Sequence, residues 1–265
     1  MLKLPRPCSP TRLLGTFVFG LAAATAAPVL AEGFGAIEGQ FVLDGAAPSL
    51  PLIAKKGDPA VKDAAVCAKE DLPDESLVVN PDNKGIANIF VYLRKAPKSI
   101  DPSLKASKTP EVVFDNKGCR YVPRAAVART DQMVRFISSD GVAHNIHTYT
   151  LGNPQQNFIL QANDMKGTAI AMKATETLPM PVKCDIHPWM RGSLIVVDHP
   201  YAAVTDADGK FKMEGLPEGE HSFRVWHENP GYVEREWKVK VVAGKTTTVP
   251  AVKVPVAKLS EKKSS

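Results

Sequence analysis

The sequence lacks the signatures of several large protein classes. It contains no glycine-rich phosphate-binding loop and no G-x-S-x-G serine motif, so it does not predict a nucleotide-dependent enzyme or a serine hydrolase. Beyond the N-terminal segment there is no apolar run of about 18 residues, the length that a membrane-spanning helix needs. Charge of one sign is also scarce, since 33 basic residues nearly balance 28 acidic ones. This balance argues against the strongly basic surface that is typical of nucleic-acid-binding proteins.

The N-terminal segment, residues 1–31, has the pattern of a secretory signal peptide. Three basic residues precede an apolar run over 13–27, and small residues follow. We expect cleavage after Ala31 and export to the periplasm or out of the cell, with an uncleaved anchor as the alternative. Removal of the three basic residues lowers the net charge from +5 to +2 and leaves no expected membrane span.

Cysteine is rare as well: the chain has four, and Cys8 leaves with the signal peptide. In an oxidising compartment cysteines tend to pair, and three cysteines leave one thiol unpaired. Cys184 lies among other metal-binding side chains and is the natural unpaired one. Cys67 and Cys119 are then the candidates for a disulfide. Two separate buried thiols remain the alternative, because the sequence spacing does not decide between them.

Short runs of β-forming residues, separated by turn signals such as TDADG and GLPEGEH, extend along most of the chain. Together with 22 prolines and 18 glycines they favour an all-β fold of sandwiches over a helical fold. We expect one short helix within 58–70 and a second within 163–173. The expected strands lie in the ranges 36–45, 86–95, 111–114, 119–127, 132–138, 192–198, 221–227 and 233–242.

The stretch VKCDIHPWM places Cys184, His187 and Met190 three residues apart, directly before an apolar run. Thiolate, imidazole and thioether groups suit copper in both of its oxidation states. A further ligand must come from elsewhere in the chain, and the cluster AHNIHTY offers His144. Copper would then have two histidines, one cysteine and a weak axial methionine, which is the donor set of a blue-copper electron-transfer centre.

Zinc is the competing interpretation, held by His144, His147, Cys184 and His187. If the segment after His144 is extended, residues 144 and 147 face opposite sides of the strand, and only one of them can reach Cys184. Zinc also leaves Met190 without a role. A chain that binds no metal is the third hypothesis, because single histidines and methionines are commonly ordinary packed residues.

The segment 108–198 resembles the cupredoxins, the small blue-copper proteins, and among them most the amicyanin type. The resemblance rests on AHNIHTY and CDIHPWMRGSLIVV, in which two residues separate the cysteine from the histidine and the histidine from the methionine. It implies that Asn145 joins the two ligand loops by hydrogen bonds and that His147 is not a ligand. The copper ligands implied by the resemblance are His144, Cys184, His187 and Met190.

The flanking segments resemble a different module, the carboxypeptidase-regulatory-like or transthyretin-type β-sandwich. AIEGQFVLDGAAP, KGIANIFVYLRKAP and TDADGKFKMEGLPEGEHSFRVWHE carry this resemblance. We therefore expect an all-β chain in which a cupredoxin Greek-key sandwich, residues 108–198, is inserted in or packed on a second sandwich formed by 32–107 and 199–255. A Cys67–Cys119 disulfide would join the two sandwiches. The whole arrangement resembles secreted bacterial proteins labelled methylamine-utilisation proteins.

The cupredoxin resemblance implies an electron carrier and not an enzyme, with one copper ion that takes an electron from a donor protein and passes it to an acceptor. In cupredoxins the second histidine ligand reaches the surface within an apolar patch. Here Val142, Pro188 and Trp189 are expected to form that patch around His187, where a redox partner docks through a small interface.

Two other functions remain open. The chain could be a non-redox binding module outside the cytoplasm, which recognises glycans or envelope proteins and holds a structural metal or none. It could instead deliver copper, although proteins that deliver copper usually have open sites rich in methionine or cysteine.

Three features lie outside the ligand motifs. Trp226, His227 and Glu228 in VWHENPG form a candidate second site, with ordinary buried residues as the alternative. The run TDADG lacks the later acidic ligands of a calcium-binding loop, so we expect a hairpin turn there. The lysine-rich end, residues 256–265, is expected to be a flexible tail.

Overall fold

The computed structural model describes Met1 and residues 33–260, and in this part of the chain it is almost entirely β, as predicted. Four sheets contain nearly all of its regular structure, and its helices are few and short. None of the helices among the described residues has the length and apolar character that crossing a membrane requires. Apart from Met1, the predicted signal peptide lies outside the described residues.

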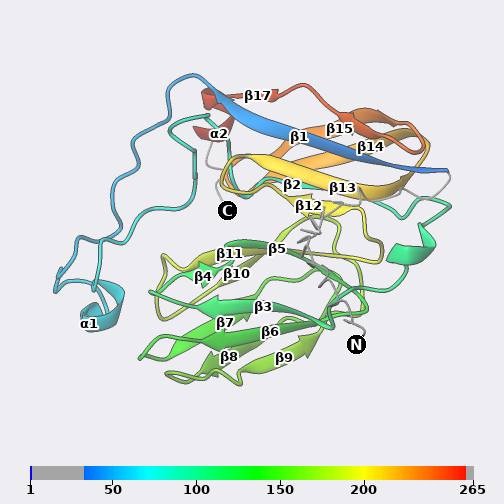
Figure 1. Cartoon of the computed structure of the whole chain (residues 1–265). Coiled ribbons are helices and arrows are strands. Elements are labelled where there is room, and N and C mark those ends of the chain that lie inside the picture. The colour runs from blue at the N-terminus through cyan, green and yellow to red at the C-terminus, as the bar shows by residue number, and fades with distance from the viewer. Residues whose placement is uncertain (2–32, 261–265) are drawn as a thin grey trace.

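Strands from both ends of the chain form one sandwich, at the top of Figure 1, which we call the terminal sandwich. Its strands are β1 (Phe34–Asp44), β2 (Phe90–Leu93), β12 (Ala202–Val204), β13 (Lys210–Pro217), β14 (Gly219–His227), β15 (Gly231–Val241), β16 (Thr246–Thr248) and β17 (Val252–Pro255). One sheet has the order β13–β1–β16, with β17 also paired to β1. The other has the order β12–β2–β14–β15.

The middle of the chain forms a second sandwich below the first, which we call the inserted sandwich (Figure 1). Its strands are β3 (Glu111–Asn116), β4 (Tyr121–Val122), β5 (Ala125–Arg129), β6 (Met133–Ser138), β7 (His144–Thr148), β8 (Asn157–Leu160), β9 (Thr168–Ala171), β10 (Met180–Lys183) and β11 (Arg191–Val197). The sheets have the orders β5–β11–β10–β7–β8 and β4–β3–β6–β9. β3 pairs with β6, and β5 with β11, in parallel.

The two sandwiches share a buried layer because β2 and β11 are covered on both faces. Successive residues of a strand point to opposite sides. Leu194 and Val196 of β11 therefore enter the inserted core, whereas Ile195 and Val197 enter a cluster between the sandwiches. The other buried members of this interface cluster are Phe90, Tyr92, Ala125 and Trp226. Burial on both faces explains why the sequence of β11 is a continuous apolar run.

The helices differ in part from those predicted. A short helix, α1 (Ala64–Cys67), lies within 58–70 as expected, and a 3-10 turn, η1 (Pro102–Leu104), follows β2. The helix predicted within 163–173 is wrong, because this range holds strand β9 (Thr168–Ala171), which pairs with β6, and turns before it. The apolar residues near Ile170 take their conformation from the neighbouring strand and not from their own helical tendency.

The C-terminal end is also more ordered than predicted. Residues Val256–Ser260 form a short helix, α2, in place of the first part of the expected tail. Leu259 on this helix is 1% exposed and belongs to the core of the terminal sandwich. Burial of the Leu259 side chain stabilises the packing of α2 on the terminal sandwich. Residues 261–265 lie outside the described residues.

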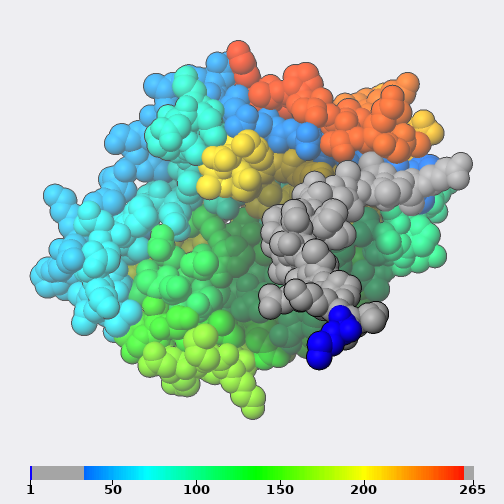
Figure 2. Space-filling model, in the orientation of Figure 1, coloured from blue at the N-terminus to red at the C-terminus, as the bar shows by residue number. Residues whose placement is uncertain are grey.

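The long connection between β1 and β2 leaves the terminal sandwich and reaches the inserted one. Its central part, residues 58–70, which we call the α1 segment, lies at the left of Figure 1 and packs against the inserted sandwich in Figure 2. Val61 and Val66 contact the inserted core, and a disulfide joins Cys67 to Cys119. The boundary predicted at residue 107 would assign the α1 segment to the terminal sandwich. Its apolar contacts and its disulfide are instead with the inserted sandwich.

Candidate metal centre

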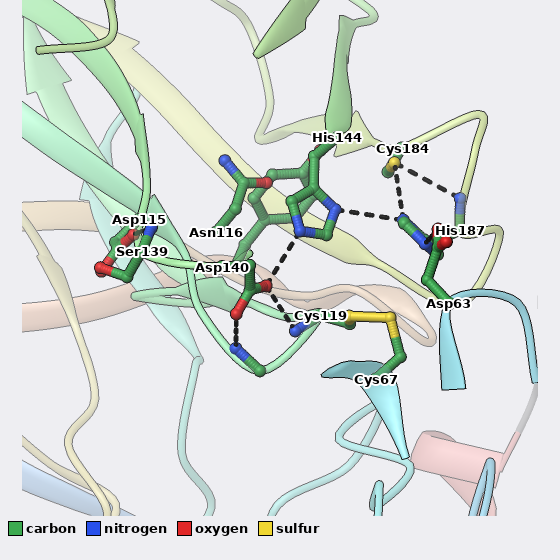
Figure 3. A network of polar contacts seen from close by, with 12 residues as sticks. Asp63, Cys67, Asp115, Asn116, Cys119, Ser139, Asp140, His144, Cys184 and His187 are labelled. Carbon is green, nitrogen blue, oxygen red and sulfur yellow. Dashed lines mark hydrogen bonds and ion pairs between the residues drawn. A yellow bond between two sulfur atoms is a disulfide. The ribbon is translucent and has the colours of Figure 1, made fainter. Parts of the chain in front are cut away.

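Three of the side chains singled out in the sequence, those of His144, Cys184 and His187, come together in the inserted sandwich (Figure 3). His144 begins β7, and Cys184 directly follows β10, which is the neighbour of β7 in the same sheet. The loop after Cys184 is closed by two backbone hydrogen bonds. The N–H of Cys184 donates to Met190 O (3.2 Å), and the N–H of Met190 donates to His187 O (2.9 Å). This tight loop positions His187 opposite His144.

Three ligand atoms converge in a buried space. The Nδ1 atoms of His144 and His187 are 3.1 Å apart, and the Sγ of Cys184 lies 3.7 Å from Nδ1 of His187. The three donor atoms all lie within 4.8 Å of one another. The histidines are 0% exposed and the cysteine 2%. Two nitrogens and one sulfur that face one another in an apolar core are a set of donors that a soft or borderline metal prefers.

A carboxylate holds the far nitrogen of each histidine. Nε2 of His144 lies 2.9 Å from Oδ2 of Asp140, and Nε2 of His187 lies 2.9 Å from Oδ2 of Asp63 (Figure 3). A carboxylate accepts a hydrogen bond from Nε2–H, so in a neutral ring the free lone pair is on Nδ1. Two such lone pairs only 3.1 Å apart repel unless a proton or a metal ion lies between them. The carboxylate–histidine pairing is the usual support of metal-binding histidines.

The thiol of Cys184 is arranged to lose its proton. Burial raises its pKa, but hydrogen bonds with both histidine rings and with the backbone N–H groups of Asn145 and His187 lower the pKa to about 6. These N–H groups lie 3.3 and 3.4 Å from Sγ. The thiolate is the form of cysteine that binds metals. The protein therefore supplies the ligand form at neutral pH.

His144 is arranged to keep a proton that a metal would replace. Burial lowers its pKa, but the hydrogen bond to Asp140 and the nearby Cys184 sulfur outweigh burial and raise the pKa to about 9. The proton can sit between the two facing Nδ1 atoms. Binding of a metal to such a set releases protons, because each ligand must present a free lone pair. The same geometry therefore fits either a shared proton or a metal ion.

The donors fit copper better than the four-ligand zinc site considered from the sequence. His147 does not join the set, because its Nδ1 lies 3.0 Å from Oδ2 of Asp185 and its ring stacks on Tyr149. Met190 is 1% exposed and belongs to the same hydrophobic cluster as Cys184. A site with two histidines, one cysteine and a buried methionine nearby matches the copper donor set.

Asn145 makes the hydrogen bonds expected of it. Its Oδ1 accepts from the N–H of Asp185 at 3.0 Å, and its Nδ2 donates to Oδ1 of Asn157 at 2.6 Å. Its backbone N–H also donates to Cys184 Sγ. The side chain thus ties the loop after β10 to β7 and β8 and fixes the distance between the ligands.

The surface around His187 differs from the expected docking patch. His187 is completely buried, because Asp63 and the α1 segment cover the ring. Trp189 is only partly exposed: its Nε1 donates to the carbonyl oxygen of Cys119 at 3.2 Å, and its ring lies 5.3 Å from that of His187. Pro188 is exposed and Val142 half-buried. The expectation of a ligand histidine that reaches the surface is wrong, since a segment distant in sequence lies over it.

Sequence reasoning missed both carboxylates of the site. Asp140 lies four residues before His144, and it also accepts the N–H groups of Gly118 and Cys119 at 2.6 and 2.8 Å. Its proximity to the histidine in sequence is a signal that could have suggested its role. Asp63 is 124 residues from His187 and carries no such signal. Only the predicted disulfide at Cys67, four residues later, pointed to this part of the chain.

The candidate second site has a structural explanation. The ring of Trp226 meets Phe90 edge-on, with 5.6 Å between centroids, in the interface cluster. Glu228 accepts two hydrogen bonds from Arg124, at 2.6 and 3.0 Å. His227 is 1% exposed. Trp226 and Glu228 thus join the two sandwiches.

Comparisons with known proteins add little. No protein-family model matches the sequence, and no curated protein matches it. Similar solved structures include an oxidized proline-to-alanine variant of amicyanin (19% identity, covering 33% of this chain and 82% of that chain) and a Cu(I) methionine-to-alanine variant of amicyanin (16%, 41% and 98%). A copper-containing nitrite reductase from Thermus scotoductus is 16% identical over 39% of this chain and 28% of its own. All three have a TM-score of 0.29, so we base the functional assignment on the geometry of the site.

Proposed function

We propose that this chain is an exported protein that binds one copper ion and carries single electrons between redox partners. The observation that supports it is the pair of histidines whose Nδ1 atoms face each other at 3.1 Å beside the Cys184 sulfur, each with its Nε2 on a carboxylate. This arrangement brings three donor atoms within 4.8 Å of one another in a buried space. A copper ion bound there supplies one-electron chemistry by alternating between Cu(II) and Cu(I).

The residues around the site suit an electron carrier because they resist movement. His144 and Cys184 lie on neighbouring strands, and two backbone hydrogen bonds close the loop from Cys184 to Met190. Asn145 ties this loop to the sheet. Ligands that keep their positions reduce the rearrangement that accompanies a change of charge. The complete burial of both histidines also keeps a substrate from reaching the donors, which favours a carrier over an enzyme.

The visible spectrum of the mature chain, residues 32–265, titrated with Cu(II) after metal removal, tests this proposal. We expect an intense thiolate-to-copper charge-transfer band at one equivalent, which ascorbate removes by reduction. Cys184→Ser should lose the band completely, because a hydroxyl does not replace the thiolate as a copper ligand.

His147→Gln is the matched control, since this neighbouring histidine contacts Asp185 and not the three donors. It should keep the band. A chain that takes up zinc tightly but gives no band with copper would contradict the proposal and support a structural metal. A chain that binds neither metal would support a non-redox binding module.

A further inference from the structure

The α1 segment places a carboxylate on the buried ring of His187. Oδ2 of Asp63 lies 2.9 Å from Nε2 of His187. The side chain of Asp63 is 36% exposed, whereas that of His187 is 0% exposed. A partly exposed carboxylate thus lies directly against a fully buried ring (Figure 3).

Several contacts hold the α1 segment in this position. The disulfide joins Cys67 to Cys119, next to the donors: both cysteine sulfurs lie within 4.8 Å of a ring nitrogen of His187. Val61 and Val66 pack against the inserted core. The N–H of Cys67 donates to the backbone oxygen of Asp63 at 2.9 Å, so the crosslink and the carboxylate belong to one hydrogen-bonded turn. The position of Asp63 is thus fixed by covalent, apolar and polar contacts.

We infer that Asp63 is a positioning residue of the copper site, which holds the Nε2 proton of His187, directs Nδ1 toward Cys184, and covers the ligand ring so that a redox partner meets the α1 segment instead of the histidine. This inference rests on the proposed function. It assigns a role in the copper site to a residue 124 positions away from its partner.

The carboxylate has a defined effect on a metal at Nδ1. A negative acceptor on Nε2–H makes the imidazole a stronger donor. The added negative charge stabilises the more highly charged Cu(II) more than Cu(I). Asp63 should therefore lower the reduction potential of the site. Loss of such a partner typically costs 10–100-fold in metal affinity (an order-of-magnitude range).

Asp63→Asn is the decisive variant because it changes charge with little change in shape. Asp63 has φ 56° and ψ 40°, the left-handed region, where asparagine is among the residues that are best tolerated. Glu70→Gln is the matched control: it removes the same charge from the same segment, and among the described residues Glu70 is exposed and pairs with Lys56 at 3.0 Å. Both variants should unfold at the same urea concentration as the wild type.

The measurement is the affinity of each mature chain for Cu(II) and for Cu(I), together with the reduction potential by spectroelectrochemistry. In Asp63→Asn we expect the Cu(II) affinity to fall about tenfold more than the Cu(I) affinity. A tenfold change in this ratio equals a rise in potential of about 59 mV for one electron. Glu70→Gln should keep the wild-type potential. A purely structural role for Asp63 would lower stability without this selective loss of Cu(II).

The possible results separate the two proposals. A wild-type chain with the charge-transfer band, but with the same potential in Asp63→Asn as in Glu70→Gln, would overturn this inference and leave the proposed function intact. A wild-type chain without the band would overturn the proposed function, and the inference with it. A band in all three chains with a higher potential only in Asp63→Asn supports both.

Discussion

At the scale of single residues, the two buried histidines show what a sequence can and cannot reveal. The spacing of Cys184, His187 and Met190 predicted a metal site with His144, because these residue types rarely gather by chance. The structure brings donor atoms of His144, Cys184 and His187 within 4.8 Å of one another. The partners of the rings were not predictable in the same way. Asp63 is the hydrogen-bond partner of His187 only because the fold brings together two residues that are 124 positions apart in the sequence. Local motifs identify donors, whereas the fold selects the groups that support them.

His227 gives the first prediction, at the same scale. Burial, and the positive charge of Arg124, lower the pKa of His227 to about 4. An unfolded chain takes up a proton at a pKa of about 6.5. The folded protein should therefore lose stability as the pH falls from 6.5 toward 4, by roughly 3 kcal/mol in total at about 1.4 kcal/mol per pH unit. His227→Gln removes this contribution, and urea unfolding at several pH values measures it.

The difference in unfolding free energy between the wild type and His227→Gln at each pH separates the effect of His227 from that of other titrating groups. His221→Gln, on the same strand β14, is the control. The free energy of unfolding should depend less steeply on pH in His227→Gln than in the control over this range. Equal slopes in the two variants would show that His227 is not the source of the loss.

At the scale of elements, the clear strands were predictable and the weak ones were not. The run 192–198 is rich in apolar, β-branched residues, a pattern that is typical of a strand buried on both faces, and β11 is such a strand. The segment that became β9 has only four strand residues, two of them alanine, and its pairing with β6 decides its conformation. β8 and β10 are equally short and were not expected. Short strands depend on neighbours that sequence patterns do not show.

The disulfide provides the prediction at this scale. The crosslink closes a loop with a sequence separation of 52 residues. By the chain-entropy argument, a loop of this length stabilises the folded state by about 4 kcal/mol, and measured values are commonly 2–4 kcal/mol (order of magnitude). The double variant with Cys67→Ala and Cys119→Ala should lower the free energy of unfolding, measured by urea titration, by about 2–4 kcal/mol.

Wild-type protein in which the disulfide has been reduced separates the crosslink from the lost sulfur atoms. Both Cys67 and Cys119 are buried, so alanine also leaves a small cavity that the reduced protein does not have. We expect the reduced wild type to fall between the oxidized protein and the double variant. A double variant as stable as the oxidized protein would contradict the stabilising role.

At the scale of the whole molecule, the layer between the sandwiches makes them one unit. Trp226 is the residue of this layer whose replacement tests the coupling of the sandwiches, because it is 8% exposed and packs edge-on against Phe90. Replacement of a buried tryptophan by alanine costs about 3–5 kcal/mol. Trp226→Ala should also uncouple the sandwiches, because it weakens the only buried cluster that draws side chains from both among the described residues.

Thermal unfolding followed by two signals tests the coupling. The chain has three tryptophans, so Trp226→Ala is studied in a Trp237→Phe background, where Trp189 is the one tryptophan left. Its fluorescence then reports on the inserted sandwich, and far-ultraviolet circular dichroism reports on all strands. The transitions should coincide in the wild type and separate in Trp226→Ala. Trp237→Ala, which changes a ring packed within the terminal core, is the control and should leave them coincident. Coincident transitions in Trp226→Ala would mean that other contacts join the sandwiches.

The pairing of β1 has a consequence for the order in which the molecule forms. This strand of 11 residues comes before the other described strands in the chain, yet the strands that pair with it, β13, β16 and β17, all begin after residue 209. The strands β3 to β11 find all their sheet partners among themselves. Contacts between distant parts of a chain form late because closing a long loop is slow. We therefore expect the middle of the chain to fold first, with most of the edge of β1 left without its strand partners, and open to aggregation, until β13, β16 and β17 pair with it.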